Sequence, residues 1–280
     1  MKKLLIIIPA IIFMVASCTE RIDIELDETY TRLVVFGSIT TDTTSHYVVL
    51  STTTSYYYNE APPPVTGANL EISDDLGNSV TLTEVAPGKY ATAPLFAAIP
   101  GRTYTLRIEL AEEVNGHKTY IASSYLSPIN QIDSIGLVER PDWGEKGFME
   151  VTCYYQDPLS RNFYMFNIFK NGEMLTDTIT NRFVSEDEFY NGNYTNGIGV
   201  GYLDQSKERE VIRDGDTVTF QGCSITEYYY NFIITLQSET GFQTPLFSGP
   251  PANVKSNISN GAAGFFAAYG VAYSSKVFQP

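Results

Sequence analysis

Hydrophobic and polar positions alternate in short runs along most of the chain. Residues Thr103 to Leu110 are the clearest case, because polar and apolar side chains alternate strictly there. A period of two is typical of a half-buried β-strand. Similar runs recur between turn residues, and Asn115-Gly116 is a strong signal for a two-residue hairpin turn. The pattern predicts a mainly β protein built as a sandwich or barrel, not as alternating βαβ units.

The predicted strands fall into two blocks. Residues 32–127 hold roughly seven short strands, a number and spacing typical of an immunoglobulin-like β-sandwich. No pair of cysteines lies in that block, so the expectation concerns the architecture alone. Ser127-Pro128 marks a boundary, and residues 128–280 are predicted to form a second β-rich domain that carries one helix.

The helix is predicted over about residues 224–239. Ser224 and Glu227 have the spacing of a capping box, and Gly241 follows as an expected end. Apolar residues then recur at helical spacing: Ile225, Tyr229, Phe232, Ile233 and Leu236. The tail from Ala262 to Val277 is expected to supply closing strands, in which Gly and Ala permit close approach of neighbouring backbones.

The first residues have the pattern of a lipoprotein signal peptide. Lys2 and Lys3 precede an uncharged run from Leu4 to Val15, which is too short to span a bilayer. Val15-Ala16-Ser17-Cys18 then matches a lipobox. We therefore expect residues 1–17 to be removed and Cys18 to be acylated. The alternative is an ordinary cleaved signal with an incidental cysteine.

An acidic segment follows Cys18. Residues 18–31 are expected to form the lipid anchor and a tether, with acids at Glu20, Asp23, Glu25, Asp27 and Glu28. Acids just after the cysteine resemble a surface-export signal of Bacteroidota lipoproteins. The expected location is the outer membrane, with the cell surface favoured over the periplasmic face.

Net charge narrows the choice of partners. Removing the two positive charges of Lys2 and Lys3 takes the net charge from −14 to −16. Such a charge opposes binding to nucleic acid and to anionic headgroups. No later run is long and apolar enough to span a bilayer, so the lipid at Cys18 is expected to be the only anchor.

Several segments together resemble a known family. They include the Cys18–Ile24 start, the Leu33–Gly37 strand, Pro62–Ala68, Tyr155–Pro158 and Pro250–Asn253, followed by Gly264–Tyr269. This order is similar to the Bacteroidota outer-membrane lipoprotein family catalogued as domain of unknown function 4249. The resemblance implies no established activity and no site residues. Because members of that family are typically encoded beside TonB-dependent receptors, it implies an accessory role in nutrient uptake.

Catalytic signals are weak. His46 and His117 are far apart in the chain, and the motifs GxSxG, HExxH, GxGxxG and the P-loop do not occur. We expect no enzyme and no cofactor. Cys153 and Cys223 remain after lipidation, and they either form a disulfide or lie buried as small hydrophobic residues.

Three further sets of residues are candidates for binding or modification. The loop residues Asp187, Glu188, Asn191 and Asn193 carry oxygen atoms of the kind calcium prefers, although their spacing fits no EF-hand and a solvated acidic loop is the alternative. Possible contact residues are Tyr56, Tyr57 and Tyr58 beside the Pro62–Pro64 run, and Tyr228 and Tyr230 on the helix. The alternative for the tyrosine run is a strand edge blunted against aggregation. Asp-Ser/Thr triplets, which look like O-glycosylation acceptors of exported Bacteroidota proteins, place candidate sites at Thr43, Ser134, Thr178 and Thr217.

The expected function is a non-catalytic binding or accessory component of a TonB-dependent system, with an unknown ligand. One alternative is a surface adhesion or structural lipoprotein. Another is a hydrolase that uses scattered carboxylates.

Overall fold

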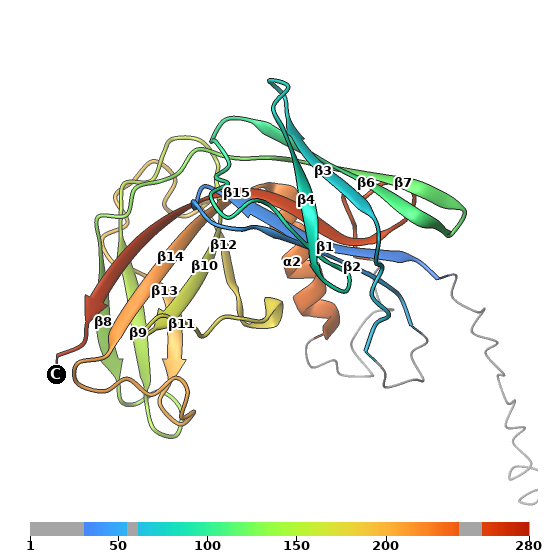
Figure 1. Ribbon diagram of the computed structural model, residues 1–280. Coiled ribbons are helices and arrows are strands. Elements are labelled where there is room, and N and C mark those ends of the chain that lie inside the picture. Colours follow the sequence, from blue (N-terminus) through green and yellow to red (C-terminus); the bar gives the residue numbers. More distant parts are fainter. Residues whose placement is uncertain (1–30, 55–60, 241–253, 280) are drawn as a thin grey trace, which may run out of the picture. The chain divides into compact units, whose positions relative to one another are not determined.

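The computed structural model describes residues 31–54, 61–240 and 254–279, and these form a mainly β structure with one α-helix (Figure 1). The elements are β1 (Leu33–Thr40), β2 (Tyr47–Thr52), β3 (Asn69–Asp74), β4 (Ser79–Ala86), β5 (Lys89–Ala91), β6 (Thr103–Val114), β7 (His117–Tyr125), β8 (Ser134–Arg140), β9 (Phe148–Tyr154), β10 (Phe163–Lys170), β11 (Glu173–Met174), the 3-10 helix η1 (Ile179–Asn181), β12 (Phe183–Glu186), β13 (Ile198–Asp204), β14 (Thr217–Ile225), α2 (Glu227–Thr240) and β15 (Ala263–Val277). The predicted fold class, mainly β with one helix, is confirmed. The immunoglobulin-like arrangement of the first block stays a prediction.

Most strands belong to one long sheet. Its order is β11-β10-β14-β15-β1-β2-β5-β4-β3-β6-β7, and β12 pairs with β10 beside it. A separate three-stranded sheet has the order β13-β9-β8. Neighbouring strands are antiparallel except β1 and β15, the first and last strands of the described residues, which run parallel.

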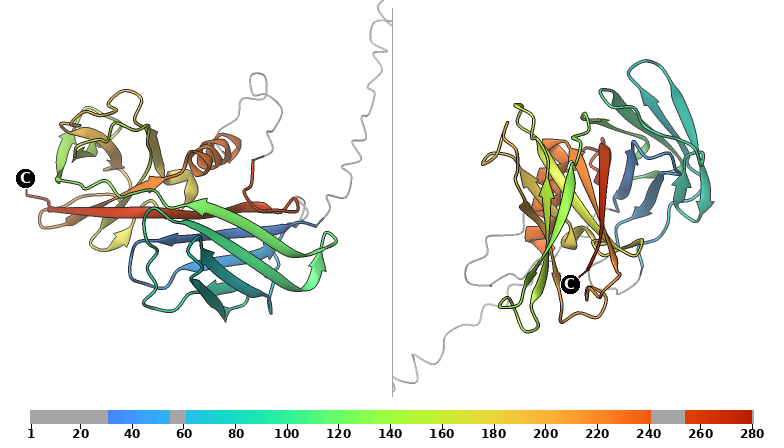
Figure 2. Two further views of the ribbon diagram at one scale, coloured as in Figure 1. Left: turned by 90° about the horizontal axis from the view of Figure 1, so that it is seen from above. Right: turned by 90° about the vertical axis from the view of Figure 1, so that its left-hand side faces the viewer.

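The strand β15 links the two blocks. Its first half pairs with β1, from Val34 opposite Ala263 to Thr40 opposite Tyr269, and its second half pairs with β14. Figure 2 shows this strand running without interruption from one group of strands to the other. Gly264 makes the first pairing possible, because a Cβ there would lie 2.0 Å from the carbonyl oxygen of Val35 and its φ is +92°. The expectation that small residues in this tail permit close backbone approach holds at Gly264.

The apolar side chains form three clusters. The first lies among β1–β7 and includes Leu33, Leu106 and Tyr120. The second lies between the three-stranded sheet and strands β10 and β14, around residues such as Val151 and Phe220. The third lies beneath α2. Successive residues of β15 enter different clusters, since Phe266 belongs to the first and Phe265 to the third.

The boundary expected at residue 127 lies just after β7, which ends at Tyr125, and it stays a prediction. Residues 31–280 nonetheless form one compact unit, because the last segment of the chain packs against the first block. Ile258, Ala262, Phe266 and Ala268 complete the cluster of β1–β7. The first block therefore takes part of its core from residues far outside 32–127.

The helix begins later than its predicted start. Ser224 and Ile225 belong to β14, where Ser224 pairs with Tyr164 on one side and Gly270 on the other. The N–H of Tyr229 donates to the Thr226 hydroxyl at 3.2 Å, so Thr226 caps the helix and the predicted Ser224–Glu227 capping box is wrong. The reason is that two strand partners hold Ser224 in an extended conformation. The predicted buried stripe of Tyr229, Phe232 and Ile233 is confirmed.

The predicted Asn115-Gly116 turn is also confirmed. Both residues have positive φ, 50° and 73°, as a type I′ turn requires, and they join β6 to β7. Among the described residues, no helix is long and apolar enough to cross a membrane.

Candidate functional site: a tyrosine-lined groove beside α2

The predicted contact residues separate in the structure. Tyr56, Tyr57 and Tyr58 lie outside the described residues, as does Cys18. Tyr228 is 82% exposed in the first turn of α2. Tyr230 instead packs against the ring of Phe163, with ring centroids 5.2 Å apart. Only Tyr228 of these residues therefore presents a free ring at the surface in the described structure.

Tyr228 borders a groove of about 790 Å³ that we call the tyrosine groove. One wall comes from α2, and the opposite wall comes from β6, β7 and the segment before β15. Its lining includes Thr103, Ser123, Tyr125, Thr226, Tyr228, Asn231, Phe232, Thr235, Lys255, Asn257 and Phe265. A volume of this size is typical of small-molecule sites in proteins.

The local structure explains why two tyrosines meet here. Tyr125 lies on the solvent side of β7, where every second residue is exposed, and its ring is 45% exposed. Tyr228 does not belong to the buried stripe of α2, so its ring points away from the core. Phe232 and Phe265 form the floor, with ring centroids 5.0 Å apart. The groove therefore has an aromatic floor and an exposed tyrosine on each wall.

The polar atoms of the groove divide into two kinds. The side chain of Asn257 is fully used, because it bonds to both backbone groups of Phe266 and donates to the carbonyl of Ser123. The hydroxyls of Tyr125 and Tyr228 and the side-chain amide of Asn231 have no partner among the described residues. These three groups are available to a ligand. The described lining contains no carboxylate, and its single cation, Lys255, is exposed.

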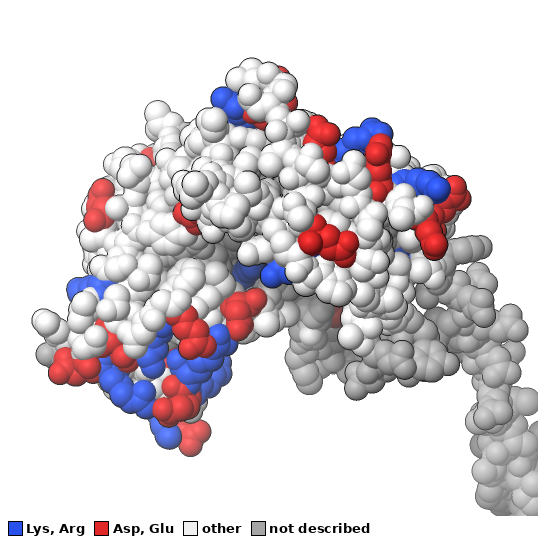
Figure 3. All heavy atoms as spheres, in the orientation of Figure 1, with Lys and Arg blue, Asp and Glu red and all other residues white. Residues whose placement is uncertain are grey.

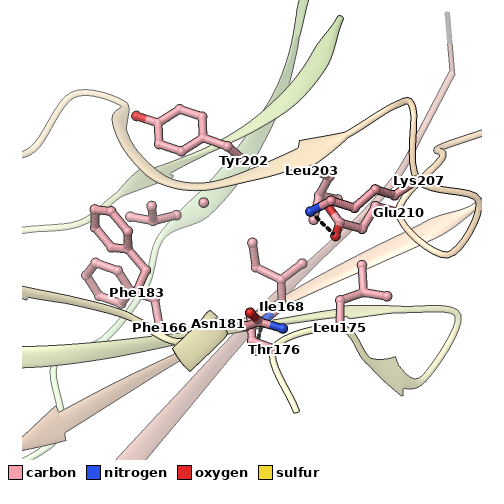
Figure 4. A pocket seen from close by; sticks show the side chains of 12 residues that line it. Phe166, Ile168, Leu175, Thr176, Asn181, Phe183, Tyr202, Leu203, Lys207 and Glu210 are labelled. Carbon is pink, nitrogen blue, oxygen red and sulfur yellow. Dashed lines mark hydrogen bonds and ion pairs between the residues drawn. The ribbon is translucent and has the colours of Figure 1, made fainter. Parts of the chain in front are cut away.

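A second, smaller cavity of about 210 Å³ opens between β10, β12 and β13 (Figure 4). Its floor is apolar, and Ile168 approaches so closely that a Cβ on Gly201 would lie 2.1 Å from the Ile168 Cδ1. Lys207 and Glu210 form an ion pair of 3.1 Å at its rim. Because the charges at the rim satisfy each other, we interpret this cavity as the open side of the second apolar cluster.

Figure 3 shows charged side chains of both signs gathered at lower left, near the ends of β8, β9 and β11. At β11 and in the connection between β13 and β14, Arg209 pairs with Glu173 at 2.9 Å and Arg213 pairs with Glu208 at 2.7 Å. Exposed pairs of this kind contribute little to stability. This region is therefore electrically balanced and offers no single-sign surface.

The disulfide alternative for Cys153 and Cys223 is corrected by the structure, in which both are free and buried. Cys153 belongs to the second cluster and Cys223 to the third. Cys223 lies on β14, and it points to the opposite side of that strand from the β14 residues that belong to the second cluster. Burial raises the pKa of the Cys153 thiol to about 12 and raises that of Cys223 as well. Both thiols are therefore protonated and behave as small core residues.

The calcium candidate loop is organised by its own hydrogen bonds. Asp187 is fully buried, and its Oδ2 accepts from the N–H of Asn162 at 2.7 Å. Asn193 donates to the carbonyl of Asn191, while Glu188 is exposed. Within the described residues no group of three or more His, Cys, Asp or Glu is arranged to hold a metal ion.

The O-glycosylation candidates differ in access. Thr43, Ser134 and Thr178 are exposed, whereas Thr217 is half-buried at the start of β14. His46 is buried, and its Nε2 lies 3.1 Å from the carbonyl oxygen of Asp42. Burial lowers the pKa of His46.

Two exposed aromatic side chains, those of Tyr125 and Trp143, were not predicted from the sequence. Tyr125 could have been found, because the period of two in β7 places it on the solvent side. Trp143 is 46% exposed beside Tyr202, with ring centroids 5.7 Å apart, and Arg140 lies over the Trp143 ring. No periodic signal marks that contact, since Trp143 lies in a turn and meets Tyr202 only through sheet pairing.

Comparison with known proteins gives a family but no activity. No curated protein matches this chain. A solved structure of a DUF4785 family protein from Legionella pneumophila aligns at 13% identity and a TM-score of 0.27, covering 69% of this chain and 52% of that one. The family model described as a domain of unknown function, DUF4249, matches residues 19–275. The chain therefore belongs to the DUF4249 family.

Proposed function

We propose that this protein is an outer-membrane lipoprotein, anchored through Cys18, that serves as a non-catalytic binding component of a TonB-dependent uptake system. The tyrosine groove carries the proposal, because it combines exposed aromatic rings with polar groups that have no internal partner. The lipobox at residues 15–18 supports the anchor, and the acids after Cys18 support the cell-surface face.

The occupant that best fits the groove is a neutral oligosaccharide. The rings of Tyr125 and Tyr228 offer flat apolar faces against which the C–H groups of a sugar can pack. The free hydroxyls and the Asn231 amide can exchange hydrogen bonds with sugar hydroxyls. The described lining contains no carboxylate, and its one cation, Lys255, is exposed to solvent, so a ligand needs no charge of its own.

Binding is tested with the full chain, solubilised in mild detergent, against a panel of neutral oligosaccharides by titration calorimetry. Tyr228→Ala removes the ring, and a buried aromatic contact is worth about 1 kcal/mol, so we expect roughly fivefold weaker binding or more. Tyr228→Phe keeps the ring and should retain most of the affinity. Phe189→Ala is the matched control, since Phe189 is 92% exposed and lies outside the groove.

Binding that survives both Tyr228→Ala and Tyr125→Ala would place the sugar elsewhere. Failure of the whole panel to bind would remove the oligosaccharide from the proposal. The uptake role is tested separately, by recovering the acylated protein from outer membranes and identifying what accompanies it. A TonB-dependent receptor is expected, and its absence would leave the adhesion alternative, which predicts binding of matrix material by the isolated protein.

A further inference from the structure

Arg182, between η1 and β12, is a half-buried arginine with no carboxylate partner. Its Nη1 donates only to the Tyr229 hydroxyl at 3.3 Å and to the Met165 sulfur at 3.6 Å. Its Nε is buried and has no acceptor. The described arginines that do pair with a carboxylate are Arg102, Arg107, Arg140, Arg161, Arg209 and Arg213.

This lack of a counter-charge stands out in an acidic protein. The chain has 32 acidic residues and 18 lysines and arginines, so partners for arginine are plentiful. Apart from Arg182, only Arg32 among the described arginines lacks an ion pair, and Arg32 is exposed at the start of the described residues. Taking a charge partly out of water without compensation costs free energy. A bound anion would offset that cost.

The position of Arg182 is fixed through its backbone. The side chain of Gln237 in α2 donates to the carbonyl oxygens of both Ile179 and Arg182, each at 2.8 Å. The N–H of Arg182 also reaches the Ile179 carbonyl, which closes η1. These bonds fix the backbone beside α2, and the bond from Nη1 to the Tyr229 hydroxyl directs the guanidinium toward that helix.

Arg182 lines a pocket of about 230 Å³, which we call the Arg182 pocket. Its walls are aromatic and come from Phe36, Tyr47, Tyr229 and Phe265. Phe36 and Tyr47 are 46% and 44% exposed, because they occupy outward positions of β1 and β2. The ammonium of Lys89 lies 4.0 Å from the centroid of the Tyr47 ring, which adds a second positive charge beside the pocket.

We infer that the Arg182 pocket binds an organic carboxylate attached to a flat apolar or aromatic group. The guanidinium presents donors in a planar fork that matches a carboxylate. The protein encloses Nε, whereas Nη2 is accessible and has no acceptor within the described residues, so the edge formed by Nη1 and Nη2 is the one open to the ligand. The half-exposed rings of Phe36 and Tyr47 provide the surface for the apolar part. This inference goes beyond the tyrosine groove, and it stands whether or not that groove binds a sugar.

The test titrates the full chain in mild detergent with N-acetyl-L-phenylalanine, followed by calorimetry and by NMR of the aromatic side chains. N-acetyl-L-phenylalaninamide has the same ring without the charge and should bind roughly tenfold more weakly, as expected for loss of a charged hydrogen bond. Galacturonate tests an acidic sugar as the source of the carboxylate, and inorganic phosphate tests an anion without an apolar group. Stronger binding of N-acetyl-L-phenylalanine than of either supports the inference as stated.

Arg182→Gln should abolish the preference for the carboxylate over the amide. Arg182→Lys should retain part of it, since lysine keeps the charge but not the fork. Arg107→Gln is the matched control, because Arg107 is exposed and paired with Glu109 on the first block. Equal binding of acid and amide by the unaltered protein, or an unchanged preference in Arg182→Gln, would overturn the inference. The comparison of acid with amide needs no variant, so it decides the question even if Arg182→Gln does not fold.

Discussion

The two blocks of this protein bury polar groups in different ways. Around β1–β7 the buried polar residues are few, and they are paired: Thr92 accepts from the N–H of His46 at 3.0 Å, and Ser124 accepts from the N–H of Ala268 at 2.9 Å. The second block buries Glu150, Asp157, Asn167, Asp187 and Gln221, among others. The buried side-chain atoms without a partner in the described structure all lie there: Thr152 Oγ1, Tyr155 Oη, Arg182 Nε and Asp187 Oδ1.

We interpret the first block as a scaffold and the second block as the region whose unpaired polar groups could bind a ligand. Buried polar groups are normally hydrogen-bonded, so each exception calls for a physical account. For Arg182, the proposed carboxylate supplies the missing counter-charge at Nη2, beside the enclosed Nε. In the first block the apolar cluster and paired polar groups give regular packing, which suits a support for the walls of the tyrosine groove.

The largest expected effect is on the strand that joins the blocks. Gly264→Ala places a Cβ against the Val35 carbonyl and puts alanine at φ +92°, so we expect a loss of about 3 kcal/mol or more in the free energy of unfolding. Because β15 belongs to both blocks, both should lose stability together in urea unfolding followed by tryptophan fluorescence and circular dichroism. Gly261→Ala is the control, since nothing lies within 4 Å of its Cβ position although its φ is also positive. Independent unfolding of the two blocks in Gly264→Ala would contradict the linkage through β15.

A matched pair of threonines tests the difference in polar pairing directly. Thr92 and Thr152 are 4% and 5% exposed, but of their two side-chain hydroxyls only that of Thr92 has hydrogen bonds. Thr92→Val should cost about 1 kcal/mol, because the N–H of His46 loses its acceptor. Thr152→Val should be neutral or stabilising, as it removes a hydroxyl that has no partner. Equal destabilisation by both substitutions in thermal unfolding would remove the distinction between the blocks.

Asp187 predicts a pH dependence of stability in the second block. Burial is the main cause that raises the pKa of this carboxyl above its usual value. A group whose pKa is higher in the folded state favours folding when protonated, and this contribution is lost as the pH rises through the folded pKa. Asp187→Asn should therefore be more stable than the unaltered protein at pH 7, by about 1 kcal/mol or less.

The advantage of Asp187→Asn should shrink as the pH falls and the unaltered carboxyl becomes protonated. Thermal unfolding between pH 4 and pH 8 measures the difference. Glu188→Gln is the neighbouring control, since Glu188 is exposed. A constant difference across this range would show that Asp187 does not titrate in the folded protein.

The smallest expected effect is on the rate at which the two cysteines react with a thiol reagent. Because Cys153 and Cys223 are buried and burial raises the pKa of both thiols, the native protein should react with a thiol reagent only as it unfolds. Mass spectrometry after timed labelling should show no modification of either residue in the native state and two in urea. Prompt labelling under native conditions would mean that one of the clusters opens readily.

The sequence predicted the structure correctly where interactions between neighbouring residues along the chain determine it. Alternation over Thr103 to Leu110 indicated the strand β6, and Asn115-Gly116 indicated its turn, because both depend on local backbone preferences. The buried stripe of α2 was also readable. The start of that helix was not, since Ser224 follows the pairing demands of β14 and not its own capping preference.

The candidate sites divide in the same manner. The sequence by itself determined the lipobox pattern at Cys18, the strand character and the outward position of Tyr228. Only the tertiary structure decided that Tyr125 lies across from Tyr228, and that Arg182 lies among the rings of Phe36 and Tyr47 without a carboxylate. Both sites depend on β15, whose Phe265 lines both cavities and which reaches β1 from the far end of the chain. A parallel pairing over more than 200 residues leaves no periodic trace in either segment, because its register is set by packing on both faces of the strand.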